Sequence, residues 1–243
     1  MRSPKETLRK AAIHLVGRQP TDAELNAVDD GDILSIDPVL DDMMGGASNK
    51  QAFLTHLKEM FNDILLTDGG VTGGAVYWKL VDANDNQFIQ APYGGSDYYT
   101  YKIWGYPIAR EPVEMVAHVV ELDRPITELV NGRYRLLNNI SSKPFGLDGS
   151  ITTSVFQEAT SVAALKQEEF AGILTTNSFQ WRYPNTETNR NRKKARYAMK
   201  IFLGFDIMKI SSPNLDTSQI VNTPAPWKTS NQCTACHSIM DPI

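Results

Sequence analysis

The two cysteines of the chain lie three positions apart and are followed at once by a histidine. Cys233, Cys236 and His237 form the pattern Cys-x-x-Cys-His close to the end of the sequence. In c-type cytochromes the two thiols add to the vinyl groups of haem, and the histidine ligates the iron from one face. Scattering two cysteines and four histidines over 243 residues would produce this pattern in roughly one chain in several thousand. The motif therefore predicts one covalently attached haem c, with His237 as the proximal ligand.

Two other uses of these cysteines stay open. A disulfide or a redox-active dithiol has the same spacing, and the redox form is typical of a helix start within a βαβ unit, which we do not expect around Cys233. A zinc site needs a fourth ligand, and the sequence holds no second cluster of cysteine or histidine. We favour haem over both alternatives.

The motif leaves the sixth position of the iron undecided. Met240 follows His237 by three residues and would stay on the same side of the ring. His118, on an apolar helical stretch, is the first candidate for a distal ligand, although a core histidine bonded to a carbonyl is the more ordinary explanation of its position. The other candidates are an open site or one of His14, His56, Met115, Met199 and Met208. A methionine ligand would raise the reduction potential, and an open site would permit small-molecule chemistry.

The composition allows a substantial buried core, as one large or two small domains. Of the 243 residues 42% are hydrophobic and 21% are charged. The net charge is −4, so no general basic field exists to hold nucleic acid, and we expect no nucleic-acid partner. No apolar run is long enough for a transmembrane helix. Hydrolase motifs such as Gly-x-Ser-x-Gly and His-Glu-x-x-His are absent from the sequence.

Hydrophobic periodicity predicts a mainly α fold, a helical bundle with long irregular loops. Residues 1–67 form an N-terminal helical region, with helices expected over 6–17, 22–29 and 49–66. The second of these begins with a capping box, Thr21-Asp-Ala-Glu24. Residues 68–108 are rich in glycine and tyrosine and are expected to be irregular. Residues 109–243 form a second helical region that ends in the haem c motif.

Within 109–243, a helix is expected over 111–122 with Pro112 in its first turn, and a short one over 126–130. Residues 138–186 are expected to form loops and short turns, and the last helix to span 188–205. A basic cluster opens that helix, made of Arg190, Arg192, Lys193, Lys194 and Arg196. It is either a solvated face or a partner for haem propionates or an acidic protein.

Four segments together resemble a known family. They are residues 110–130, Gly172-Ile-Leu-Thr175, the Arg-rich stretch 189–205, and Cys233-Thr-Ala-Cys-His-Ser-Ile-Met-Asp-Pro242. In these patches the chain resembles the planctomycete-type haem-binding proteins, which are exported and carry conserved domains of unknown function. The resemblance implies a mono-haem c-type centre with Cys233 and Cys236 as attachment residues. It does not imply a reaction.

Haem attachment of this kind takes place outside the bacterial cytoplasm, so we expect a periplasmic or extracellular protein. The charged start, Met1 to Lys10, lacks the apolar stretch of a secretory signal. The family's glycine and aromatic segment after the Asp-Pro step is also missing, so we expect a trimmed piece of a longer precursor. Electron transfer to an unknown redox partner is favoured over catalysis. A haem enzyme with an open iron, or an interaction module with a Cys-x-x-Cys disulfide, are the alternatives.

Overall fold

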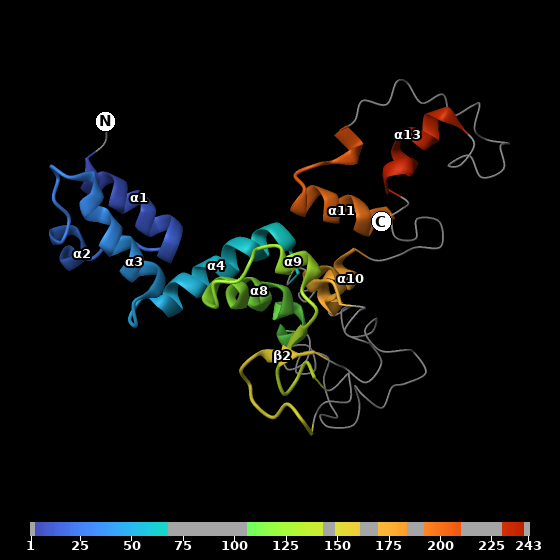
Figure 1. Ribbon diagram of the computed structural model, residues 1–243, viewed down its shortest axis with the longest axis horizontal. Helices are drawn as coiled ribbons and strands as arrows, with labels where there is room; N and C mark the ends of the chain where they lie inside the picture. Colours follow the sequence, from blue (N-terminus) through green and yellow to red (C-terminus); the bar gives the residue numbers. More distant parts are fainter. Residues whose placement is uncertain are drawn as a thin grey trace, which may run out of the picture.

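The computed structural model describes residues 3–67, 106–142, 149–160, 170–183, 192–209 and 230–240. Helices dominate these segments, so the predicted mainly α fold is confirmed (Figure 1). The glycine- and tyrosine-rich stretch lies outside the described residues up to position 105. The described part contains no helix that is both long and apolar enough to cross a membrane.

The N-terminal region holds four helices and one short 3-10 turn. These are α1 (Pro4–Val16), α2 (Asp22–Asn26), η1 (Ile33–Ile36), α3 (Asp37–Gly45) and α4 (Lys50–Leu65). Ser3 caps α1 by accepting from the Glu6 amide, and the capping box of Thr21 and Glu24 opens α2 as predicted. The sequence did not predict α3, which begins with proline in its first turn.

These elements enclose a first hydrophobic core. Its buried members come from α1, η1, α3 and the turn after α2: Leu8, Ala12, Val16, Val28, Ile36, Val39 and Met43. Arg18 ties the region together, donating to both carboxylate oxygens of Glu24 at 2.9 and 2.7 Å and to Asn49 Oδ1 at 2.8 Å. The Arg18 hydrogen bond lowers the pKa of Glu24 to about 2, although burial acts in the opposite direction.

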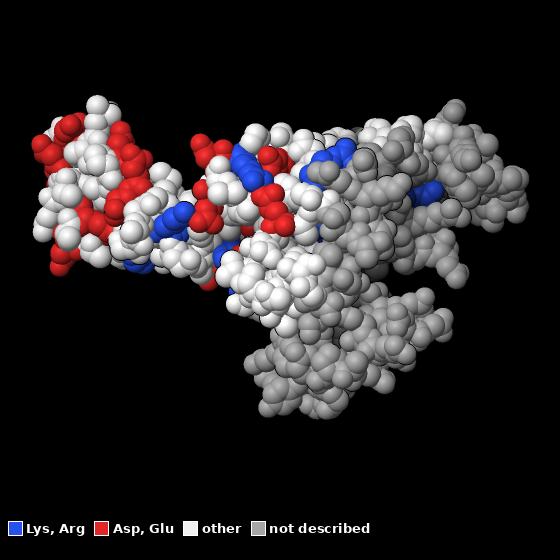
Figure 2. Space-filling model, turned by 60° about the horizontal axis from the view of Figure 1, so that its bottom comes forward, with Lys and Arg blue, Asp and Glu red and all other residues white. Residues whose placement is uncertain are grey.

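One face of this region is acidic (Figure 2). Positions 19–49 contain eight Asp or Glu residues and no Lys or Arg. Figure 2 shows their carboxylates gathered over the end of the molecule that α1, α2 and α3 form. A surface of this sign favours basic partners and repels polyanions.

The central region is built around α8 (Tyr106–Glu121), which packs against α4 and α10. The sequence placed the start of this helix at Glu111, which is wrong by about one and a half turns. Pro112 lies inside the helix, where it lacks the amide that would bond to Ile108. Ile108 and Ala109 are nevertheless buried, so packing of the first turns offsets the missing hydrogen bond.

A second core surrounds α8, and short elements complete it. They are α9 (Glu128–Asn131), η5 (Gly172–Thr175), α10 (Asn177–Arg182) and the strands β1 (Arg135–Leu137) and β2 (Gln157–Ala159). The strands pair antiparallel, with Leu136 opposite Glu158. The core includes Leu65, Val113, Met115, Val116, Val119, Leu129, Tyr134, Leu136, Ile173, Phe179 and Tyr183. β2 and α10 lie where the sequence predicted loops and short turns.

The C-terminal elements are α11 (Arg192–Phe202), η6 (Ile207–Lys209) and α13 (Asn231–Met240). α11 joins the second core through Tyr197, which stacks on Tyr183 with ring centroids 4.2 Å apart. α11 also contacts η6 and α13 (Figure 1). The motif residues are therefore held on a helix that packs against the end of the molecule opposite α1.

Candidate functional site

The Cys-x-x-Cys-His pattern lies within helix α13, which the sequence did not predict as a helix. Ser230 precedes this helix, and its carbonyl accepts from the amides of Cys233 and Thr234 at 3.0 and 2.9 Å. Residues three and four apart share one face of a helix. Positions 233, 236 and 237 therefore lie on one face of α13.

The two motif side chains that the structure describes are partly accessible. Cys233 is half-buried and carries a free thiol. His237 is half-buried in the last turn of α13. The side chain of Cys236 lies outside the described residues. A thiol and an imidazole on one face of a helix are two of the three groups that a haem attached through this motif requires.

Cys233 is the third residue of α13, and a helix start is also the usual place of a redox-active dithiol. Such dithiols sit in βαβ units with parallel strands. The described part of the chain contains a two-stranded antiparallel sheet, made by β1 and β2. Cys233 therefore has the helix-start position of a redox-active dithiol, but the sheet in the described residues is antiparallel and does not belong to a βαβ unit.

His118, the predicted candidate for a distal ligand, lies near the end of α8 and is engaged in a polar cluster. Its Nε2 is 2.7 Å from Glu158 Oε1, and its ring meets Tyr134 edge to face at 5.8 Å. Arg124 binds the same carboxylate at 2.6 Å. Burial raises the pKa of Glu158, but the hydrogen bonds from His118 and Arg124 outweigh it, and the net shift is downward.

This cluster explains His118 without a metal. The carboxylate of Glu158 joins β2 to α8, and Arg124 also lies 3.5 Å from Glu128 of α9. A histidine bonded to a carboxylate is held in one orientation. The structure therefore gives His118 a structural partner, and an iron would have to compete with Glu158 for Nε2.

The other candidate ligands differ sharply in exposure. Met115 is fully buried in the second core and Met199 is 3% exposed, whereas Met208 is 69% exposed. His14 is exposed on α1, and His56 on α4 lies 3.6 Å from Glu59. Among the described residues, no three His, Cys, Asp or Glu side chains group closely enough to hold a metal ion.

The basic cluster at the start of α11 is partly used within the chain. Arg196 forms two hydrogen bonds to Asp206, at 2.9 and 3.0 Å, and Lys194 donates to Gln180 of α10. Burial lowers the pKa of Lys194. Lys193 and Arg192 are half-buried beside them. The cluster therefore fastens α11 to its neighbours, in addition to any role toward an anionic group.

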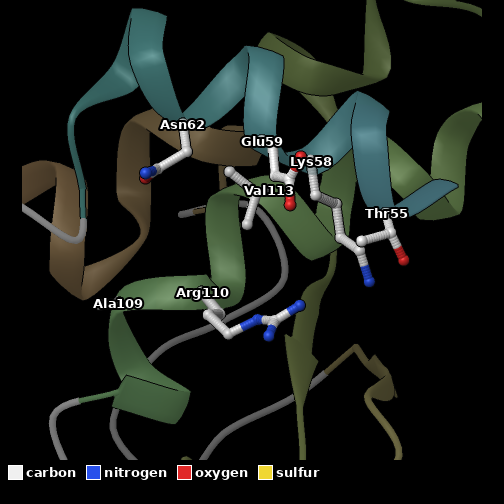
Figure 3. A pocket seen from close by; sticks show the side chains of 7 residues that line it. All are labelled: Thr55, Lys58, Glu59, Asn62, Ala109, Arg110 and Val113. Carbon is white, nitrogen blue, oxygen red and sulfur yellow. The ribbon is translucent and has the colours of Figure 1, made fainter. Parts of the chain in front are cut away.

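Sequence reasoning missed a pocket between α4 and α8 (Figure 3). Lys58 of α4 and Arg110 of α8 extend toward each other there, and both donate to Glu114, at 3.2 and 2.7 Å. Arg110 and Glu114 are four residues apart on one helix, a spacing that the sequence does show. Lys58 is 56 positions away from Glu114 and gives no local signal. Glu59 also lines the pocket, and together with Glu114 it balances the charges of Lys58 and Arg110.

Comparisons with protein-family models, with curated proteins and with solved structures find no match to this chain.

Proposed function

We propose that this protein is an exported mono-haem c-type cytochrome domain that transfers single electrons in the periplasm or outside the cell. The observation that carries the proposal is the Cys-x-x-Cys-His pattern on one face of α13, where Cys233 has a free thiol. Each residue type has a part in haem attachment, and the pattern is rare by chance.

Each of the three motif residues would have its own role in binding haem. The thiols of Cys233 and Cys236 would each add across a vinyl group, which fixes the ring to α13 by two bonds. His237, one residue further along the same face, would then meet the iron from the proximal side. A haem bound in this way supplies the site that gains and loses one electron, while the protein sets its potential and its access to solvent.

Electron transfer is the simplest use of a covalently attached haem, because the iron gains and loses one electron without any further reacting group. The alternative is an interaction module in which Cys233 and Cys236 form a disulfide. The position of Cys233 in the first turn of α13 supports that alternative, because a helix start is the usual place of a redox-active dithiol.

One expression experiment tests the proposal. The chain is produced in a bacterial periplasm together with the haem-attachment machinery, then denatured, and its mass and visible spectrum are measured. We expect one haem per chain in the wild type and none in Cys233→Ser/Cys236→Ser. His237→Ala should keep a covalent haem but lose the low-spin spectrum. Ser238→Ala, an exposed neighbour on α13, should behave as the wild type.

Two results would contradict the proposal. A wild-type chain without haem, and with its two thiols oxidised to each other, would favour the interaction module. A haem that washes out on denaturation, at equal levels in the wild type and the double variant, would show that the cysteines play no part in binding.

A further inference from the structure

Three large apolar side chains are exposed just beyond the end of α11. Leu203 is 72% exposed, Phe205 39% and Met208 69%. They fall within six consecutive residues, and Ile239 on α13 adds a fourth at 43%. Exposed apolar residues are ordinary when scattered singly, but a group of them on one short segment indicates a surface that is covered by something.

This segment has a defined shape. Arg196 holds Asp206 by two hydrogen bonds, and Asp206 Oδ1 also accepts from the Met208 amide at 3.1 Å. The amides of Leu203 and Phe205 both donate to the Met199 carbonyl, at 2.9 and 3.2 Å. The apolar side chains are therefore presented on an ordered turn.

The same helix supports this turn and the motif. α11 contacts both η6, which contains Met208, and α13, which contains Cys233 and His237. Figure 1 shows α11, η6 and α13 together at one end of the molecule. A haem attached to α13 would therefore be separated by α11 alone from the exposed apolar segment 203–208, which contains the thioether of Met208.

We propose that Leu203, Phe205 and Met208 cover the haem attached to α13, and that the Met208 sulfur is the sixth ligand of the iron. This inference rests on the proposed function. It commits to haem as the occupant because a porphyrin needs apolar contacts on its faces and because a thioether is a common axial ligand. Burial separates Met208 from Met115 and Met199, whose side chains already fill the cores.

The ligand assignment is tested on purified protein whose single covalent haem has been verified by mass. Met208→Ala should lose the weak red absorption band of ferric iron bound by a thioether, lower the reduction potential and bind cyanide faster. Met208→His should give the spectrum of an iron with two histidine ligands. Met60→Ala, at a methionine of α4 that is 42% exposed, is the matched control and should leave all three readouts unchanged.

The cover is tested separately by stability. Leu203→Ser removes an apolar group that is 72% exposed in the chain itself, so it should leave the Tm of the haem-free Cys233→Ser/Cys236→Ser background unchanged. In the haem-loaded protein the same substitution should lower Tm, because it strips contacts from the ring.

The outcomes separate the two proposals. A covalent haem whose spectrum, potential and cyanide kinetics are indifferent to Met208→Ala overturns the ligand assignment alone. An equal change in Tm with and without haem overturns the cover. A wild-type chain that never acquires a covalent haem overturns the proposed function and this inference with it.

Discussion

At the scale of single residues, the most buried charges of the described residues form an ion pair that joins α8 to β1. Glu111 and Arg135 are each 1% exposed, and two hydrogen bonds of 2.5 Å connect them. Removing one member leaves the other charge buried without its counter-ion. We therefore expect Arg135→Met to lower the free energy of unfolding by about 3–5 kcal/mol. Urea denaturation of the wild type and the variant measures this difference.

Two controls make that measurement specific. Lys50 and Glu121 lie 2.8 Å apart but are each 42% exposed, so Lys50→Met should cost about 0–1 kcal/mol. The double variant Glu111→Leu/Arg135→Met removes both buried charges and should recover much of the loss. A double variant as unstable as Arg135→Met alone would mean that side-chain volume, and not charge, sets the cost.

At the scale of elements, a single glycine allows η5 to pack closely on α9. Gly172 has φ +51°, and a Cβ at this position would lie 2.4 Å from the Leu129 carbonyl oxygen. Its amide also donates to the Gly132 carbonyl at 3.0 Å. Gly172→Ala therefore combines positive-φ strain, about 1–2 kcal/mol, with a clash against backbone. We expect a loss in unfolding free energy clearly larger than the strain alone.

Gly204 serves as a control that measures the cost of positive φ without a clash. Its φ is +65°, and nothing lies within 4 Å of a Cβ built there, so Gly204→Ala should lose about 1–2 kcal/mol and no more. Chemical denaturation of both variants gives the comparison. Equal losses at the two positions would show that η5 moves away from α9 at little cost.

Elements with a long apolar stripe could be predicted from the sequence, and the others could not. α1 and α4 begin and end within two residues of their predicted limits because each places an apolar face against a core. α13 was missed because cysteine and histidine occupy positions that an apolar stripe would use. β1 and β2 have three residues each, too few to show alternation.

The candidate site could likewise be predicted only in part from the sequence. The identity of Cys233, Cys236 and His237 follows from residue type and spacing, which the sequence states directly. The exposure of Met208 and the burial of Met115 depend on how distant elements pack, so both methionines were equal candidates beforehand. The carboxylate that holds His118 belongs to Glu158 of β2, 40 positions away, and no local sequence pattern predicts such a contact.

At the scale of the whole molecule, the described residues form three hydrophobic cores, and the two larger ones share one helix. The first half of α4 packs Ala52 and Phe53 against the N-terminal core, and the second half packs Leu57, Phe61 and Leu65 against the central one. Separate cores unfold separately when the surface between them is small. Among the described elements, α4 makes the most extensive contact between residues 3–67 and the central region, through its packing on α8.

This arrangement predicts a local response to damage in the first core. Leu8 of α1 is fully buried, and Leu8→Ala should cost about 2–5 kcal/mol. Hydrogen exchange read by mass spectrometry should show protection lost from α1, α3 and the start of α4, while α8 and α10 keep theirs. Ile13→Ala, on the same helix but 43% exposed, should change little. Loss of protection spread evenly into α8 would instead mean that α4 couples the two cores into one cooperative unit, and that the motif helix depends on the N-terminal core as well.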